Sequence, residues 1–268
     1  MRWFAICLLA AFLPLAIAQA EPSGSVFLED LTWTELRSGI EAGKTTIIIP
    51  AGGTEQNGPL MALGKHNVRV KALAEKIAIA LGNAMVAPVI AYVPEGNISP
   101  PTEHMKFPGT ITISDQTFEA LLDSTARSLR HAGFTQIVLI GDHGGYQKDL
   151  EIVAQRLNKE WAPGPAQAHY IAEYYRSTLA EYTQALLGRG ARARDIGTHA
   201  ALADTSLMLA VNPALVRRER LASASTLGAS DGVYGGDPSA ASPEYGQLGV
   251  DLIVKNTVEA IHKATMGH

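Results

Sequence analysis

Three stretches of the chain, two of them glycine-rich, carry imidazole and carboxylate side chains, the groups that bind divalent metals and transfer protons in proteins. The first stretch contains Glu55 and, eleven residues later, His66, and the second, with the sequence GDHGG, contains His143. The third contains His199 and Asp204. One carboxylate with two imidazoles is a ligand set that suits Zn²⁺ or Mn²⁺ and leaves a position open for water. We therefore predict a divalent-metal site formed by Glu55, His66 and His143.

Other polar groups in and near these stretches are candidates for the remaining steps of a hydrolysis. His199, Asp142 and Asp204 are candidates to carry a proton between water and a leaving nitrogen. For His199 the alternative is a structural imidazole hydrogen-bonded at a turn, whereas Asp142 is expected to orient the ring N–H of a ligand. The backbone N–H groups of residues 144 and 145 are candidate oxyanion donors, and His104 is a candidate to line a substrate pocket.

The elements that must position these groups alternate between predicted strands and helices. Short apolar runs predict the strands, and apolar residues three or four positions apart predict the helices between them. We expect strands over residues 45–49, 85–93, 136–140 and 167–174, and helices over 68–81, 118–131, 150–161 and 248–264. This alternation is typical of an α/β fold in which helices cover both faces of a mostly parallel sheet. Ligands bind beyond the carboxyl ends of such strands, where Glu55 and His143 are expected.

The composition is that of a globular protein with a sizeable core. The chain has 268 residues, of which 22 are basic and 26 acidic, and 47% are hydrophobic. This balance excludes a chain that is disordered throughout. The small negative net charge of −4 gives no electrostatic reason to expect nucleic acid as a partner. The proline- and glycine-rich stretches are typical of long loops, so we expect a single domain over residues 21–268.

The first twenty residues have the pattern of a secretory signal peptide. Arg2 lies in a basic start, residues 3–18 are apolar, and Ala18 and Ala20 form a small-x-small cleavage site. We expect cleavage after Ala20, a periplasmic or secreted protein, and no membrane partner after cleavage; the alternative is an uncleaved anchor. Cleavage removes Cys7, the only cysteine, so the mature protein can form no disulfide, zinc–thiolate site or cysteine nucleophile.

Five segments of the chain resemble, in order, the motifs of a known family. They are PAGGTEQNGP at 50–59, EHMKFPGT at 103–110, GDHGG at 141–145, DTS at 204–206 and GVYGGDP at 232–238. On these motifs the chain resembles the creatininase (creatinine amidohydrolase) family. The resemblance implies a three-layer α/β/α sandwich and a divalent metal at the carboxyl edge of the sheet. It also implies hydrolysis of a non-peptide, often cyclic, small-molecule amide by a homo-oligomer.

The resemblance is incomplete at the metal ligands. Glu55 and His143 match family ligands, but Asn57 stands where the family usually has a histidine ligand. His66 stands where the family usually has an aspartate that bridges two metals, and Leu202 falls where many members have a glutamate. A neutral imidazole cannot bridge two cations as a carboxylate does. With these departures, we expect one Zn²⁺ or Mn²⁺ per chain.

Two functions from different classes follow from this pattern. The first is an exported metal-dependent amidohydrolase that cleaves the C–N bond of a cyclic amide. The second is a non-catalytic small-molecule binding protein on the same scaffold with a degenerate metal site. The direction of His66 distinguishes them, because a ring directed at Glu55 and His143 indicates a remodelled site and a ring directed away indicates a decayed one. The chain has no phosphate-binding glycine loop.

Overall fold

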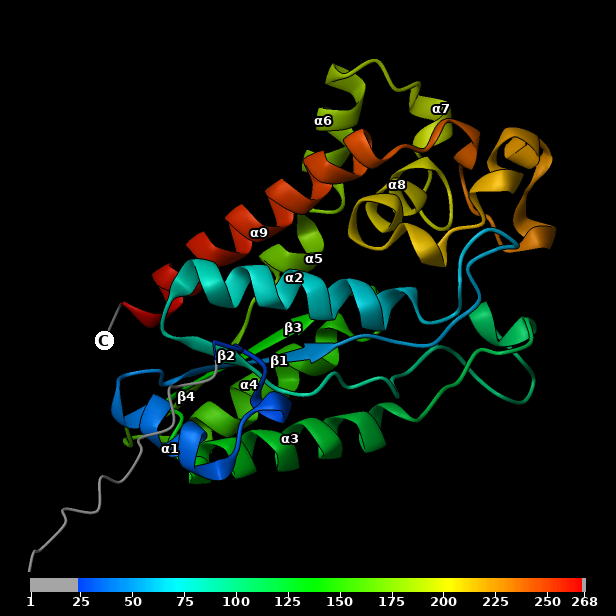
Figure 1. Cartoon of the computed structure of the whole chain (residues 1–268). Coiled ribbons are helices and arrows are strands. Elements are labelled where there is room, and N and C mark those ends of the chain that lie inside the picture. Colours follow the sequence, from blue (N-terminus) through cyan, green and yellow to red (C-terminus); the bar gives the residue numbers. More distant parts are fainter. Residues whose placement is uncertain (1–23, 267–268) are drawn as a thin grey trace, which may run out of the picture.

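The computed structural model describes residues 24–266 of the chain (Figure 1). The expected signal peptide and its cleavage site at Ala20 lie outside the described residues. Of the helices in the described range, none has the length and apolar character needed to cross a membrane.

A four-stranded parallel sheet forms the middle of the fold. Its strands are β1 (Thr46–Ala51), β2 (Ala84–Val86), β3 (Gln136–Gly141) and β4 (Gln167–Tyr170), in the order β2-β1-β3-β4. The chain leaves β1 towards β2 on one side and leaves β3 towards β4 on the other. The two connections diverge, so a crevice opens between the carboxyl ends of β1 and β3, where α/β proteins bind their ligands.

Helices cover both faces of this sheet, and the three-layer α/β/α fold expected from the sequence is confirmed. In Figure 1, α2 (Lys65–Leu81) and α9 (Pro243–Thr265) lie on one side of the strands, and α3 (Asp115–Ala132) and α4 (Gln147–Trp161) lie on the other. The side chains of β1 alternate accordingly: Ile47 and Ile49 pack in the core with α3 and α4, and Ile48 packs in the core with α2 and α9. The helices are α1 (Trp33–Glu41), α2 (Lys65–Leu81), α3 (Asp115–Ala132), α4 (Gln147–Trp161), α5 (Glu173–Arg176), α6 (Ala180–Gly188), α7 (Ala193–Ile196), α8 (Leu202–Val211) and α9 (Pro243–Thr265).

The boundaries of three elements differ from the sequence prediction. Helix α2 begins at Lys65, three residues before the first apolar position that predicts it, because its first turn is buried through ion pairs. Strand β2 ends at Val86, since Pro88 has no backbone N–H to continue the ladder. Strand β4 ends at Tyr170, and the predicted remainder of that strand turns into α5. The early start of α2 has the largest consequence for the site, because it places Lys65 and His66 on a helix.

Candidate metal centre

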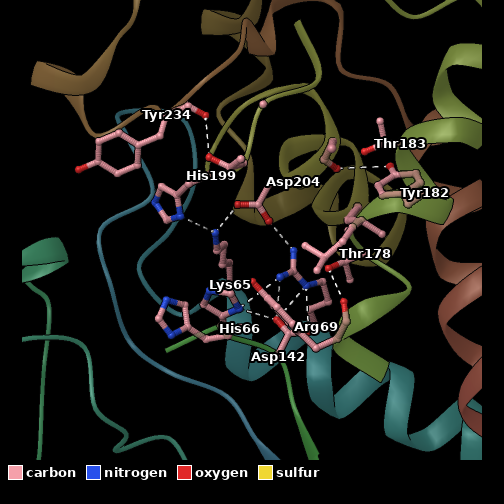
Figure 2. A pocket seen from close by; sticks show the side chains of 18 of the residues that line it. Lys65, His66, Arg69, Asp142, Thr178, Tyr182, Thr183, His199, Asp204 and Tyr234 are labelled. Atoms are coloured by element: carbon pink, nitrogen blue, oxygen red, sulfur yellow. Dashed lines mark hydrogen bonds and ion pairs between the residues drawn. The ribbon is translucent and has the colours of Figure 1, made fainter. Parts of the chain in front are cut away.

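A cavity of about 680 Å³ opens at the carboxyl edge of the sheet. Side chains from all three predicted stretches line it, together with side chains from α2 and from the segments that follow β4 (Figure 2). The predicted site residues in this lining are His66, Asp142, His143, His199 and Asp204. The structure therefore brings these predicted residues together at one edge of the sheet, and Glu55, which is fully buried, lies at the centre of the group.

The two carboxylate oxygens of Glu55 face different surroundings. Oε2 lies 3.1 Å from Nε2 of His104 and 3.5 Å from Nε2 of His143. Oε1 lies 2.7 Å from Nε2 of His66 and 3.4 Å from Nζ of Lys65. One carboxylate thus joins two clusters of buried polar groups, and the two clusters differ in how completely their groups are paired.

The first cluster, here called the carboxylate–imidazole cluster, consists of Glu55, Glu95, His104 and His143. One possible ligand atom from each residue lies within 4.8 Å of all the others. Oε2 of Glu55 and both oxygens of Glu95 are buried and have no hydrogen-bond partner among the described residues. Buried carboxylate oxygens left unpaired cost free energy unless a cation or donor reaches them. Two carboxylates and two imidazoles are a donor set that fits Zn²⁺ or Mn²⁺.

The protonation of this cluster also suits a metal site. Burial, followed by the charge of Glu55, raises the pKa of Glu95 to about 10. Burial lowers the pKa of His143 to about 3 and lowers that of His104 from its usual value. At neutral pH both imidazoles are therefore neutral and keep a lone pair for a metal. Glu95 holds a proton that a divalent cation would displace.

Glu95 reaches the cluster through a gap left by a glycine. A Cβ atom on Gly53, whose φ is +147°, would lie 2.5 Å from Oε1 of Glu95. The backbone N–H of Glu95 donates to Oγ1 of Thr112 at 2.9 Å, which fixes the loop after β2. Sequence reasoning missed Glu95, because it lies in a loop without periodic apolar residues. Only the packing of that loop against Gly53 brings the carboxylate to Glu55.

The second cluster, here called the ion-pair cluster, consists of Lys65, Arg69, Asp142 and Asp204. Lys65 Nζ forms a short contact with Oδ2 of Asp204, and Arg69 Nη1 donates to Oδ1 of the same carboxylate at 2.6 Å. Arg69 Nε donates to Oδ2 of Asp142 at 2.9 Å. Figure 2 shows Arg69 between the two aspartates and Lys65 directed towards Asp204 and His199. Each carboxylate in this cluster therefore has a cationic partner.

Asp142 and Asp204, two of the predicted proton carriers, are held in the ionised state by this cluster. Burial opposes the charge of Asp142, but Arg69 and His66 outweigh it and hold its pKa below the usual value. Burial likewise opposes the charge of Asp204, and Lys65 and Arg69 hold its pKa well below the usual range. A carboxylate with a lowered pKa is a poor proton donor at neutral pH.

His66 lies between the two clusters. Its Nε2 faces Oε1 of Glu55, and its Nδ1 lies 2.5 Å from Oδ2 of Asp142. The ring centroids of His66 and His143 are 5.3 Å apart. The ring is thus directed at Glu55 and lies beside His143, but both of its nitrogens are paired and it does not belong to the carboxylate–imidazole cluster. Asp142, which was expected to orient a ligand, orients His66.

His199, the third predicted proton carrier, lies at the cavity wall next to Tyr234, with ring centroids 5.4 Å apart. Burial, followed by the charge of Lys65, lowers its pKa to about 3, so the ring is neutral at physiological pH. Its Nε2 lies 3.0 Å from the backbone oxygen of Gln56. The Gln56 side-chain amide lies 3.1 Å from the same nitrogen and 3.0 Å from Nδ1 of His104. Gln56 therefore couples the positions of both rings.

Two other features of the site differ from their expected roles. The N–H of Gly145 donates to Nδ1 of His143 at 3.2 Å, so this amide is directed at the ring and away from an oxyanion position. Asn57 donates through Nδ2 to the backbone oxygens of Glu55 and Ala62, at 2.9 and 3.0 Å. The amide that stands at a family ligand position therefore shapes the loop that carries Glu55.

Tyr146 holds together the two loops that carry Glu55 and His143. Its hydroxyl accepts from the N–H groups of Asp142 and His143, both at 3.1 Å, and donates to backbone oxygens at the end of β1. This one hydroxyl fixes the loop after β3 against the loop after β1. The separation of Glu55 and His143 is thereby set by the protein before any metal binds.

The comparisons with known proteins agree with this geometry. Residues 29–261 match the creatininase family model, described as creatinine amidohydrolase. Creatinine amidohydrolase of Pseudomonas putida is 27% identical over 261 residues, which cover 90% of this chain and 98% of that protein. A mycofactocin precursor peptide peptidase of Mycolicibacterium smegmatis is 32% identical over 127 residues, 44% of this chain and about half of that protein.

Solved creatininase structures have the same fold. A crystal structure of creatinine amidohydrolase aligns with a TM-score of 0.73 and 24% identity, over 92% of this chain and 100% of that one. A creatininase described as the Mn form aligns at 0.71, with 24% identity over 90% of this chain and 99% of that one. A mutant described as the Zn–Zn type aligns at 0.70, with 22% identity over 91% and 99% of the two chains. The chain belongs to the creatininase family and is a metal-dependent amidohydrolase of that family.

Proposed function

We propose that the protein hydrolyses the C–N bond of a small, non-peptide cyclic amide with one divalent metal ion, Zn²⁺ or Mn²⁺, held at the carboxylate–imidazole cluster. The observation that carries this proposal is the set of buried, unpaired oxygens of Glu55 and Glu95 that face two neutral imidazoles. A divalent cation is the group that would satisfy all of these atoms at once.

Glu55 and His143 enter this proposal as the sequence predicted, and Glu95 and His104 join them. His66 remains the predicted third ligand only if its Nε2 exchanges Oε1 of Glu55 for the metal. In the observed geometry that nitrogen is paired with Glu55, and Nδ1 faces Asp142. We therefore propose that His66 positions the Glu55 carboxylate and that His104 takes the ligand position.

A divalent ion at this cluster would supply a Lewis acid that polarises an amide oxygen and lowers the pKa of water. The residues of the chain provide the rest of the chemistry. Glu55, fixed on its Oε1 side by Lys65 and His66, stays ionised, because these neighbours offset its burial and hold its pKa well below the usual value. Asp142 and Asp204 are too strongly paired to carry a proton to the leaving nitrogen. The ring of His199, with a pKa of about 3, is too weak a base at neutral pH, so we propose that it lines the cavity and positions Gln56.

The cavity supports a small-molecule substrate. Its volume of about 680 Å³ lies within the range typical of small-ligand pockets, and aromatic side chains such as Tyr175 and Tyr234 line it with polar ones. The cyclic-amide class rests on the match to creatinine amidohydrolase along nearly the full length of both proteins. The four clustered ligand groups favour this proposal over the alternative of a non-catalytic binding protein with a degenerate metal site.

The test is a metal and activity assay of the purified protein. Metal-free protein is loaded with Zn²⁺ or Mn²⁺, its metal content is measured by elemental analysis, and hydrolysis is screened on a panel of cyclic amides that includes creatinine. The expected result is about one ion per chain and hydrolysis that is lost with a chelator. His143→Ala should lose both the bound metal and the hydrolytic activity. His131→Ala, which alters an exposed histidine of α3, should keep both. Full activity of His143→Ala would overturn the proposal.

We also propose that the protein is exported, cleaved after Ala20 and assembled as a homo-oligomer in the periplasm or medium. The basic start, the apolar run and the small-residue cleavage site support export, and the family resemblance supports assembly. Mass analysis of the native N-terminus should give a chain that starts at Glu21. An intact Met1 would contradict export, and a monomeric mass in solution would contradict assembly.

A further inference from the structure

The side chain of Lys65 is almost completely buried, with 1% of its surface exposed, and its ammonium lies inside the centre. Nζ lies 3.4 Å from Oε1 of Glu55 and 3.5 Å from Nδ1 of His199, and it forms a short contact with Oδ2 of Asp204. Lysine is rarely buried to this degree unless its charge is paired. Here the fold places the charge against two carboxylates and an imidazole.

The three groups around Nζ are themselves a ligand set. Two carboxylate oxygens and one imidazole nitrogen bind a divalent cation elsewhere in proteins. Glu55 belongs to both clusters, since its Oε2 faces His104 and His143 while its Oε1 faces Lys65. A carboxylate with one oxygen on each of two cations is the arrangement that bridges the ions of a two-metal centre.

We propose that the ammonium of Lys65 takes the place of a second metal ion, so that the centre of this protein pairs one divalent metal with one built-in cation. This inference rests on the proposed function, because it requires the first ion at the carboxylate–imidazole cluster. It gives a physical reason for the altered ligands at positions 57 and 202. A monovalent ammonium has no vacant coordination sites, so it needs neither the histidine nor the glutamate that those positions usually supply.

Arg69 keeps the remaining partner of Lys65 in place. Its guanidinium donates to Asp204 at 2.6 Å and to Asp142 at 2.9 Å, and through Asp142 it supports His66. Asp204 therefore remains ionised and directed at Nζ. The lysine is fixed by charge on one side and by the Glu55 bridge on the other, which excludes a divalent ion from that position in the native chain.

The experiment removes the ammonium and counts the metals. Native protein, Lys65→Ala, Lys65→Gln and Lys65→Arg are purified as full chains, freed of metal and titrated with Mn²⁺. Elemental analysis gives the stoichiometry, and electron paramagnetic resonance distinguishes an isolated Mn²⁺ from a coupled pair. Lys71→Ala is the matched control, because Lys71 lies on the same helix but is exposed and paired with Glu29. Circular dichroism verifies that each variant is folded.

We expect one isolated Mn²⁺ in the native protein, in Lys65→Arg and in Lys71→Ala. We expect two coupled ions in Lys65→Ala, because Glu55, Asp204 and His199 are then free to bind the second. Lys65→Gln keeps most of the side-chain volume without the charge, so if the alanine variant does not fold, two ions in the glutamine variant carry the same support. One ion in folded Lys65→Ala and Lys65→Gln would overturn the inference, as would a coupled pair in the native protein. No ion in the folded native protein would instead overturn the proposed function.

Discussion

The two clusters that share Glu55 are buried to a similar depth but differ in pairing. In the ion-pair cluster every carboxylate has a cationic partner. In the carboxylate–imidazole cluster three buried carboxylate oxygens have no hydrogen-bond partner within residues 24–266 and face neutral imidazoles. Burial alone therefore does not identify a ligand site. The difference teaches that the ion-pair cluster is structural support, complete in itself, whereas the carboxylate–imidazole cluster is incomplete without a cation.

The largest expected effect is the loss of stability when the ion-pair cluster is disrupted. Arg69→Leu leaves the buried charges of Asp142 and Asp204 without their shared partner. Loss of one partner of a buried ion pair typically costs about 3–5 kcal/mol of unfolding free energy. Urea denaturation of metal-free protein should show a loss of this size for Arg69→Leu and a small change for His143→Ala. Equal losses in the two variants would contradict the division into a support and a binding cluster.

The next effect separates the two histidines that contact Glu55. His104→Ala removes a proposed ligand, so its affinity for Zn²⁺ should fall by more than the roughly 10–100-fold typical of residues that only orient ligands. The loss of Zn²⁺ affinity in His66→Ala should stay within that roughly 10–100-fold range. Competition with a chromogenic chelator measures both affinities. If His66→Ala loses more affinity than His104→Ala, the original prediction of Glu55, His66 and His143 as the ligands is the better one.

A third effect concerns the proton on Glu95. The pKa of about 10 means that this carboxyl is protonated at pH 7, whereas His143 and His104 are neutral. Metal binding should therefore release about one proton per ion, and the affinity should increase as the pH rises towards 10. Calorimetric titrations at pH 7 in two buffers of different ionisation enthalpy give the proton count. Binding without proton release would exclude Glu95 as a ligand.

The smallest effect is on the stability of the metal-free protein. The usual pKa of 4.5 for Glu95 applies to the unfolded chain, so between pH 4.5 and about 10 the folded state holds the extra proton. The unfolding free energy contributed by this group therefore falls as the pH rises through that window. Glu95→Gln removes the effect, so its melting temperature in the presence of a chelator should exceed that of the native protein at pH 8, by a few degrees. If the melting temperatures of Glu95→Gln and the native protein differ by the same amount at pH 5 and at pH 8, the link to the protonation of Glu95 is wrong.

Much of the fold could be predicted from the sequence because its core is periodic. Apolar runs such as residues 45–49 and the spaced apolar residues of α2, α3 and α9 carry the α/β pattern directly. The ends of the elements were harder to place. The first turn of α2 is stabilised by ion pairs between residues far apart in the chain, and these leave no periodic signal at Lys65 or His66.

Two of the four residues of the carboxylate–imidazole cluster could also be predicted from the sequence, from their positions after strand ends. Glu55 and His143 follow strand ends in glycine-rich loops, which the topology brings to one edge of the sheet. His104 was expected only as a pocket residue, and Glu95 was not expected to take part. Both lie in the segment between β2 and α3, whose path depends on the space at Gly53 and on the Gln56 amide. Contacts of this kind exist only once the chain is folded.

The most direct test of the central claim is a crystal structure of the protein soaked with Mn²⁺, with the ion located by its anomalous scattering. The account predicts one peak per chain, within roughly 2.0–2.2 Å of ligand atoms from Glu55, Glu95, His104 and His143. It also predicts that the Lys65 ammonium remains between Glu55 and Asp204. Two peaks on either side of Glu55, or a single peak bound by His66 with Glu95 turned away, would contradict it.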